Sequence, residues 1–252
     1  MRKNFAITKN ARRVLFAVNT LNSSSHGTER MGLLYGMPGE GKSCTADWCI
    51  DKTDGIVIRA KRCMTMTSFL QELATELRCP EKTRRSNRSA VIIDSVIEHL
   101  NERPRPLFVD EIDTFFSPHN LKNGNNILET IRDIHDSVSV PILLIGEENS
   151  AINVQENSRF ARRVTQWIEL KGIDLEDTKT VATTICEATV ADDLLDHLYQ
   201  EAGGNIGRIV IALDAIERHC KAAGVAEMDV KEWSGKALFF DQPAFARKRG
   251  RA

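Results

Sequence analysis

The sequence lacks several features that mark common protein classes. Its six cysteines form no C-x-x-C pair, and no pair of histidines stands nearby at the spacing of a zinc finger. This pattern argues against a zinc site and fits free thiols in a reducing compartment. No apolar stretch has the form of a signal peptide or approaches the length of a membrane span. We therefore predict a cytoplasmic protein with no membrane partner.

An excess of charge of one sign is also missing. The chain has 34 Lys and Arg against 35 Asp and Glu, which gives a formal net charge of -1. Any surface for nucleic acid must therefore be a local basic patch rather than a property of the whole chain. The 252 residues suffice for one large domain, or for one domain with a small appendage.

Short apolar runs alternate with helical patterns over the first two thirds of the chain. The apolar runs predict strands at 31–36, 56–60, 107–111, 141–148 and 165–170. Helical spacing of apolar residues predicts helices at 8–22, 67–77, 89–103 and 125–138. Strands that are apolar throughout and are joined by helices are typical of a parallel sheet covered on both faces. The expected class is therefore α/β.

The last third of the chain shows helical patterns alone. Helices are predicted at 176–187, 191–202 and 207–223, with no strand after about residue 171. The predicted segments are an N-terminal helix and linker (1–30), an α/β domain (31–171), a small helical lid subdomain (172–235) and a basic tail (236–252). The tail could contact DNA or a partner protein, but we expect a mobile solubilising end.

The stretch YGMPGEGKS (35–43) gives the strongest functional signal. It fits G-x-x-x-x-G-K-[ST], follows an apolar strand and precedes a plausible helix. Its glycines let successive backbone N–H groups turn toward phosphate oxygens, and the helix N-terminus adds its dipole. Lys42 would reach the β- and γ-phosphates of ATP, and Ser43 would ligate Mg²⁺. The residues expected to bind ATP are Gly36, Pro38, Gly39, Glu40, Gly41, Lys42, Ser43 and Cys44. A plain glycine turn is the alternative.

The stretch LFVDEID (107–113) supplies an acidic partner for this loop. Asp110 ends an apolar run, where its carboxylate could hold Mg²⁺ through water, and Glu111 could polarise the attacking water as general base. An exposed acidic turn is the alternative, but carboxylates at the edge that carries a phosphate loop favour the catalytic interpretation. The extra strand at 56–60 is typical of one branch of P-loop proteins. The predicted fold is a P-loop NTPase with a parallel sheet flanked by helices and a helical lid.

Three further stretches resemble the AAA+ ATPases. PILLIGEENS (141–150) stands where that family has sensor 1, RFARRV (159–164) where it has an arginine finger, and GGNIGRI (203–209) where it has sensor 2. The resemblance implies that Arg208 on the lid faces the nucleotide. It also implies that one of Arg159, Arg162 and Arg163 reaches the γ-phosphate of a neighbouring subunit. A finger that acts on a neighbour requires a homo-oligomer.

Within AAA+ the chain is similar to the transposition regulators, the group of the phage Mu B protein and the TnsC/TniB-type ATPases. The likeness spans residues 8–220 and is carried by TKNARRV, DEIDTF, IRDIHDSVSVPILLIG and GNIGRI. It implies an ATPase that assembles with ATP and Mg²⁺ as a filament or ring on duplex DNA, without sequence preference, and delivers that DNA to a transposase. Hydrolysis would disassemble the oligomer.

The chain departs from that group in two places. Glu147 and Glu148 stand where a small polar residue usually follows the glycine of the sensor strand, which leaves Glu147 or Asn149 for the sensor 1 position. A carboxylate beside the γ-phosphate would be repelled. The N-terminal DNA-binding module of the Mu B protein is not expected here.

Basic residues gather in two stretches that could bind DNA. AKR (60–62) follows the second strand, and EKTRRSNRSA (81–90) is rich in arginine. The predicted contacts are Lys61, Arg62, Thr67, Lys82, Arg84, Arg85 and Arg88. Such residues would hold backbone phosphates, which gives salt-sensitive binding that tolerates any sequence. A solvated basic loop is the alternative.

Two other functional classes stay open. A replication initiator or helicase loader would carry a winged-helix domain after the lid, for which we expect too few residues. A secretion-associated ATPase or a signalling switch would usually carry a membrane segment or an added sensor domain, and neither is indicated.

Overall fold

The computed structural model describes residues 1–25, 27–234 and 236–239. The chain divides into two compact units. The α/β unit is Ile7–Lys171, and the helical unit joins Met1–Ala6 to the chain from Gly172 onward. Most of the predicted basic tail, including its arginine-rich end, lies outside the described residues.

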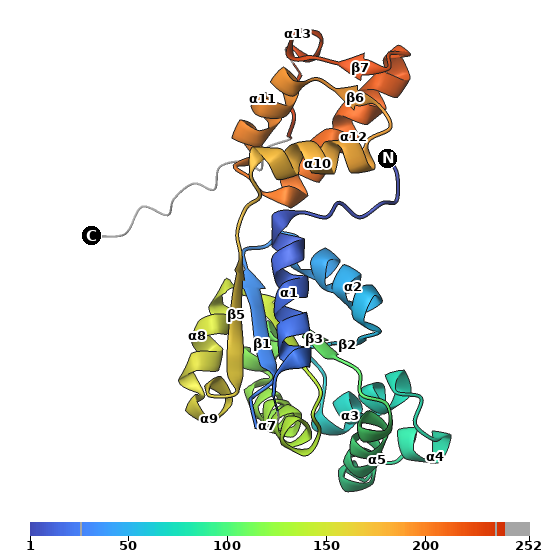
Figure 1. Cartoon of the computed structure of the whole chain (residues 1–252), viewed down its shortest axis with the longest axis vertical. Helices are drawn as coiled ribbons and strands as arrows, with labels where there is room; N and C mark the ends of the chain where they lie inside the picture. Colours follow the sequence, from blue (N-terminus) through green and yellow to red (C-terminus); the bar gives the residue numbers. More distant parts are fainter. Residues whose placement is uncertain (26, 235, 240–252) are drawn as a thin grey trace, which may run out of the picture. The chain divides into compact units, whose positions relative to one another are not determined.

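The α/β unit is built on one five-stranded parallel sheet (Figure 1). Its strands are β1 (Met31–Gly36), β2 (Ile56–Arg59), β3 (Leu107–Asp110), β4 (Ile142–Glu147) and β5 (Val164–Leu170). Their order is β2-β3-β4-β1-β5, so β4 lies between the two strands that carry the functional motifs. The predicted parallel sheet is therefore confirmed, with each strand close to its expected bounds.

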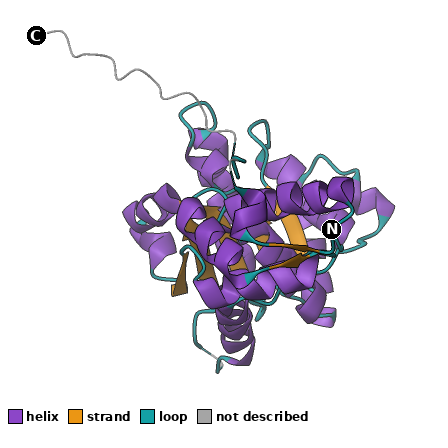
Figure 2. Cartoon of the chain, turned by 90° about the horizontal axis from the view of Figure 1, so that it is seen from above, coloured by secondary structure: helices purple, strands orange, loops and turns teal. Residues whose placement is uncertain are grey.

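Alternate side chains of the sheet point into two separate cores. On one face, Leu34, Phe108 and Leu143 pack with α1 (Lys9–Ser23) and α2 (Lys42–Thr53). On the other face, Leu33 and Leu144 pack with a second set of helices. That set includes α3 (Met66–Glu76), α5 (Ser89–Glu102), α6 (Asp113–Phe116), α7 (Leu121–Ser137), α8 (Glu148–Glu156) and α9 (Ser158–Ala161). Helices therefore cover both faces of the sheet, as two buried faces require; Figure 2 distinguishes helices in purple from strands in orange.

Short helices were the weak point of the sequence prediction. The expected loop at 81–90 contains α4 (Glu81–Arg84), and α8 and α9 follow β4 where no helix was predicted. Helix α7 begins at Leu121 instead of residue 125, with Gly124 inside it. A Cβ at Gly124 would lie 2.1 Å from the carbonyl oxygen of Phe115, so close packing explains this glycine better than a helix boundary does.

The helical unit has its own apolar core. Its helices are α10 (Leu175–Ile185), α11 (Asp192–Ala202), α12 (Ile206–Ala223) and α13 (Val230–Trp233). Leu194, Leu198, Leu213 and Ile216 are buried at its centre. None of the helices in the described ranges is long and apolar enough to cross a membrane.

The expectation of no strand after residue 171 is wrong. β6 (Thr189–Val190) and β7 (Glu227–Met228) form a parallel pair in the helical unit. The Thr189 N–H donates to the carbonyl oxygen of Ala226, and the Ala191 N–H donates to that of Met228, both at 2.9 Å. Strands of two residues are too short for an alternating pattern to reveal them.

Candidate active site

The loop between β1 and α2 folds around the side chain of Lys42. Its Nζ donates hydrogen bonds to the carbonyl oxygens of Gly36 (2.8 Å) and Met37 (2.9 Å). The Met37 N–H donates to Oε2 of Glu40 (2.9 Å), so a carboxylate already engages one of the loop's backbone donors. Burial raises the pKa of Glu40, although the Met37 N–H and Lys42 oppose the shift.

Two glycines of the loop are required by its backbone. A Cβ at Gly36 would lie 2.4 Å from the carbonyl oxygen of Leu170, at the end of β5. Gly41 has a φ of 81° at the N-cap of α2. This left-handed conformation is unfavourable for residues that carry a side chain. The loop therefore stays narrow. The N–H groups of Met37 and Glu40 are engaged within it, by the Glu40 carboxylate (2.9 Å) and the Met37 carbonyl oxygen (3.4 Å).

The acidic motif reaches the same edge of the sheet. Asp110 ends β3 and is only 4% exposed. Glu111 follows with a φ of 62°, which is strained for a residue with a side chain. Burial raises the pKa of Glu111, and the nearby charges of Asp110 and Asp113 raise it further. A carboxylate of raised pKa is a better proton acceptor.

Asp113, which sequence reasoning missed, links the acidic motif to the sensor strand. Both of its carboxylate oxygens accept from the Glu147 N–H at 2.9 Å, and one accepts from the hydroxyl of Ser150. Ser150 is fully buried, and a Cβ at Gly146 would lie 2.2 Å from its Oγ. The D-x-x-D spacing was visible in the sequence, but its partner lies 34 residues away. The side chains of Glu147 and Asn149 are exposed, so the choice between them as sensor 1 stays a prediction.

Arg59 is a second residue that the sequence analysis missed. Its Nε and one terminal nitrogen donate to Oδ2 of Asp110, at 3.3 and 3.2 Å. The two residues are register partners at the ends of β2 and β3. A cation therefore already neutralises the buried carboxylate that was assigned to Mg²⁺.

We expect Arg59→Met to lower thermal stability in the absence of Mg²⁺ and to enlarge the stabilisation that Mg²⁺ gives. The buried Asp110 carboxylate would lose its partner, at a cost of about 1 kcal/mol because Arg59 is itself largely exposed. It would then be free for another cation. Thermal unfolding at increasing Mg²⁺ with ATP measures both effects. Arg103→Met, which breaks an ion pair with Asp54 before the opposite ends of the same two strands, is the matched control. Equal Mg²⁺ responses in the two variants would contradict the expectation.

The oxygen donors at this edge fit Mg²⁺. Ser43 lies in the first turn of α2, and the carboxylate of Asp110 lies at the end of β3 with those of Glu111 and Asp113 beside it. Carboxylate, hydroxyl and water oxygens are the ligands that Mg²⁺ prefers. With Lys42 and the N-terminus of α2 beside these oxygens, the edge can hold a phosphate chain and its metal.

Comparison with known proteins places this arrangement in a family. Residues 25–153, just over half of the chain, match the family described as AAA domain. The chain belongs to this AAA family. The predicted P-loop fold class, a parallel sheet flanked by helices and followed by further helices, is thereby confirmed.

Relatives of the AAA domain match it over most of its length but extend beyond it. The chain is 26% identical over 164 residues to cell division protein C of Sulfolobus acidocaldarius. The aligned part makes up 62% of this chain and 40% of that protein. The ORC2 protein of Aeropyrum pernix superposes with a TM-score of 0.70 at 15% identity, covering 90% of this chain and 66% of that one. The ORC1 protein of Aeropyrum pernix, solved in complex with DNA, superposes at 0.61 and 13% identity, over 85% and 60%. At these identities, the two structures show a shared fold.

The three candidate finger arginines of the AAA domain differ in their surroundings. Arg163 is held by Asp136 through Nε (2.8 Å) and a terminal nitrogen (2.5 Å), and this pair lowers the pKa of Asp136. Arg159 and Arg162 are exposed, and neither makes an ion pair within the described ranges. The finger role stays a prediction, and the ion pair of Arg163 favours the other two.

The R-D-I-H-D stretch has a structural explanation. Nε2 of His135 accepts from the Arg30 N–H (3.1 Å) just before β1, which places the ring proton on Nδ1. That proton faces Asp136 (3.3 Å) and Glu29 (3.5 Å). These three side chains lie close enough to surround a metal ion, but a protonated Nδ1 cannot ligate one. The cluster instead fixes the end of α7 to the starts of β1 and β5.

Arg208 lies in the helical unit, near the start of α12. Asn205 caps that helix by accepting from the Arg208 N–H (3.1 Å). The guanidinium lies 4.3 Å from the ring centroid of Phe239 and donates to the carbonyl oxygen of Glu201 (3.4 Å). These contacts hold the side chain within its own unit, and its role toward nucleotide stays a prediction.

Four of the predicted DNA contacts lie at or just before the first turns of α3 and α5, and the other three, Lys82, Arg84 and Arg85, lie on α4 or at its end. The hydroxyls of Thr67 and Ser89 are hydrogen bonded at 3.0 Å, which joins the first turns of the two helices. Lys61 and Arg62 precede α3, and Arg88 is the N-cap of α5. Segments that are more than 20 residues apart in the sequence thus share one surface.

Several of these cations have partners. Lys61 pairs with Glu72 (2.8 Å) and Arg85 with Glu81 (2.7 Å), while Nε of Arg84 is buried without a hydrogen-bond partner. The exposed cations that make no ion pair within the described part of the chain are Arg62, Lys82 and Arg88. Arg62 and Arg88 precede α3 and α5, and Lys82 is on α4.

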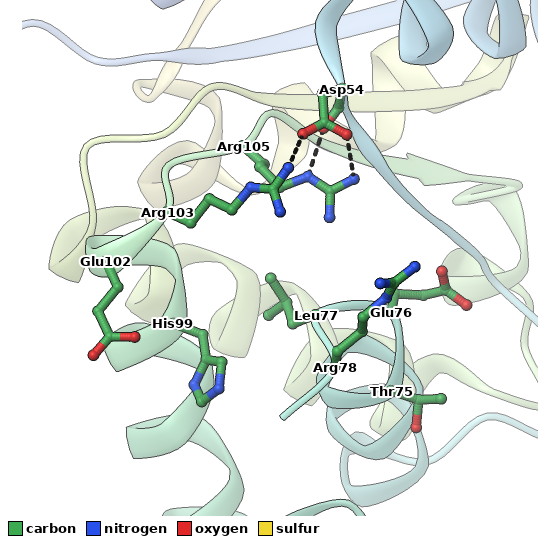
Figure 3. Close-up of a pocket in the computed structure, with 9 residues that line it drawn as sticks. All are labelled: Asp54, Thr75, Glu76, Leu77, Arg78, His99, Glu102, Arg103 and Arg105. Carbon is green, nitrogen blue, oxygen red and sulfur yellow. Dashed lines mark hydrogen bonds and ion pairs between the residues drawn. The ribbon is translucent and has the colours of Figure 1, made fainter. Parts of the chain in front are cut away.

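A recess of about 520 Å³ opens at the opposite edge of the sheet (Figure 3). Arg103 and Arg105 both pair with Asp54 there, at 2.8 and 2.9 Å. Three acidic side chains line the recess with three arginines, so their charges balance. The recess is therefore a poor match for a phosphate chain, in contrast to the loop around Lys42.

Proposed function

We propose that this AAA domain is an ATPase that binds duplex DNA when ATP is bound and assembles into a homo-oligomer as it does so. Membership of the family implies nucleotide hydrolysis. The single observation that carries the proposal is that two motifs share one edge of the sheet. The loop that contains Lys42 follows β1, and the Asp110–Glu111 pair stands at the end of β3.

The residues at this edge have complementary roles in hydrolysis. The loop N–H groups and Lys42 would bind the phosphates, and Ser43 and Asp110 would hold Mg²⁺, which neutralises phosphate charge. Glu111 would accept a proton from the water that attacks the γ-phosphorus. The bond from that phosphorus to the β–γ bridging oxygen would break, giving ADP and phosphate. An exposed arginine of a neighbouring copy, Arg159 or Arg162, would stabilise the charge of the transition state.

ATP would promote assembly because the arginine of the neighbour contacts it only in the oligomer. A ligand that binds at a subunit junction stabilises the oligomer by its differential affinity.

DNA phosphates would bind where α3 and α5 begin. The N-terminus of α5 has no side-chain cap, so it can offer backbone N–H groups there, whereas the N-terminus of α3 is closed by a capping box of Thr65 and Ser68. Arg62, Lys82 and Arg88 supply the positive charge. The ORC1 protein, which shares the fold, has been solved with DNA.

The combined substitution Arg62→Gln, Lys82→Gln and Arg88→Gln should weaken DNA binding and flatten its salt dependence. Each phosphate contact that is lost should reduce the slope of log K against log [salt] by about 0.9. Fluorescence anisotropy with a labelled duplex, with ATP and Mg²⁺ at several salt concentrations, measures the slope.

The control carries the same change in charge elsewhere on the α/β unit, through Lys52→Gln, Arg103→Gln and Lys171→Gln. It should retain the parent slope. A surface variant with an unchanged slope would mean that DNA binds elsewhere or not at all.

Replication initiation is a better-supported setting than transposition. The comparisons give a cell division protein and ORC proteins, which match the alternative of an initiator-type ATPase. The transposition-regulator likeness depended strongly on R-D-I-H-D, and that stretch is explained by contacts with Arg30 and Arg163. Delivery of target DNA to a transposase is the second candidate. A cytoplasmic location also remains a prediction.

The two settings differ in what DNA they require. An initiator should enrich particular sequences from a random pool of duplexes, whereas a transposition regulator should coat any duplex. Sequencing of the bound pool, together with electron microscopy of the protein with ATP and long duplex DNA, separates them.

A further inference from the structure

Helix α1 exposes a large apolar side chain within a basic surface. Phe16 is 74% exposed at the middle of the helix. Arg12 and Arg13, one turn before it, are also exposed and make no ion pair within the described ranges. The helix contains no acidic residue. An exposed aromatic ring with two arginines one turn before it is typical of a protein-binding surface.

Helix α8 shows the opposite pattern. Ile152 is 58% exposed at its middle. Glu148 and Glu156 lie four residues before and after it, so the three side chains form one stripe along the helix. Both carboxylates are exposed, and they make no ion pair in the part of the chain that the structure describes. The helix contains no basic residue.

The two helices belong to the same α/β unit but lie on opposite faces of its sheet. Val14 and Val18 of α1 pack in one core, and Ala151 and Val154 of α8 pack in the other. A chain therefore cannot place its own α1 on its own α8. Contact of α1 with a second α1, or of α8 with a second α8, would bring like charges together.

We propose that α1 of one copy docks on α8 of the next copy. Phe16 meets Ile152 at the centre of the contact, and Arg12 and Arg13, which lie one turn before Phe16, face the glutamate on the same side of Ile152, Glu148 or Glu156. Because the two surfaces are different and lie on opposite faces, the contact is head-to-tail and repeats along a filament or around a ring. This inference rests on the proposed homo-oligomer and assigns its subunit contact.

Charge reversal tests the contact through complementation. One chain carries Arg12→Glu and Arg13→Glu, so both of its surfaces are acidic. The other carries Glu148→Lys and Glu156→Lys, so both of its surfaces are basic. For each variant alone, the protein concentration at the midpoint of assembly should rise at least tenfold. An equimolar mixture should regain it, since each surface then meets its complement. Sedimentation velocity with ATP and Mg²⁺ measures assembly, and thermal unfolding with far-UV circular dichroism confirms that each chain is folded. ATP affinity is measured separately, because Glu148 lies within electrostatic reach of Glu40 in the loop.

Cross-linking tests the geometry in chains that keep their native charges. A Phe16→Cys chain mixed with an Ile152→Cys chain should give cross-linked dimers with a short bifunctional thiol reagent, well above either chain alone. The parent chain, with its exposed Cys44 and Cys63, gives the background. A chain carrying both substitutions should give a ladder of products.

The outcomes separate this contact from the proposed function. Assembly of the parent chain without complementation or mixed cross-links would overturn the contact and leave the ATPase oligomer in place. Cross-links between two Phe16→Cys chains would also overturn it. Loss of DNA binding without loss of assembly in the Arg12/Arg13 variant would assign the α1 surface to DNA instead. A parent chain that stays monomeric with ATP and DNA would remove the oligomer and the contact together.

Discussion

Replacement of Lys42 by alanine is expected to abolish productive ATP binding. The Nζ of Lys42 is the positive charge at the centre of the loop, where it bonds the carbonyl oxygens of Gly36 and Met37. Charge-assisted hydrogen bonds to phosphate contribute roughly 3 kcal/mol in total, so affinity should fall about 100-fold or more. Isothermal titration with ATP and Mg²⁺ measures this loss, and DNA binding that requires ATP should disappear with it.

The matched control is Lys52→Ala, in the last turn of the same helix. It removes the same charge and the same side chain, but it lies at the far end of α2 from the loop. ATP affinity should be close to that of the parent chain. If Lys42→Ala bound ATP within about threefold of this control, the loop would not be the phosphate site. If it formed oligomers on DNA normally, assembly would not depend on ATP.

Replacement of Glu111 by glutamine should nearly stop hydrolysis and leave ATP binding intact. The amide keeps the shape of the side chain but cannot accept a proton from water. Loss of a general base lowers turnover by about 10²- to 10⁴-fold. Phosphate release at saturating ATP measures turnover, and titration measures binding. Because ATP would persist at the subunit junctions, the oligomer on DNA should dissociate more slowly than that of the parent chain.

Glu169→Gln provides the comparison for this variant. Glu169 is an exposed carboxylate near the end of β5, and it contributes to the electrostatic environment of Glu40 in the loop. Its substitution changes the net charge by the same amount and should leave turnover near that of the parent. Turnover within twofold of the parent in Glu111→Gln would remove Glu111 as the base.

The sequence was sufficient for the parts of the site that depend on neighbours in the chain. The glycines and Lys42 of the loop are close in the sequence and shape one local stretch of backbone. The apolar runs around them predict the order of strand, loop and helix. The same holds for Asp110 at the end of β3. Both motifs could be placed at one sheet edge because parallel strands present their carboxyl ends together.

The missed residues act across long distances in the chain. Arg59 and Asp110 are 51 residues apart, Asp113 and Glu147 are 34 apart, and each pair meets only because of strand order. The R-D-I-H-D stretch was interpreted as a functional signature because its partner, Arg163, follows it by 27 residues and could not be recognised. Charge alone also did not show that Lys61 and Arg85 are paired, while Arg62 and Arg88 make no ion pair with any residue that the structure describes.

The backbone of Glu111 has a consequence for how this position is maintained. A φ of 62° costs a glutamate about 1 to 2 kcal/mol, whereas glycine would adopt it freely. Folding by itself therefore selects against the residue that is present. A glycine at this position would avoid that cost, so the stability of the fold alone does not account for the glutamate in this chain. At position 111, a single substitution by glycine therefore allows the change in the free energy of unfolding to be compared with the change in ATP turnover.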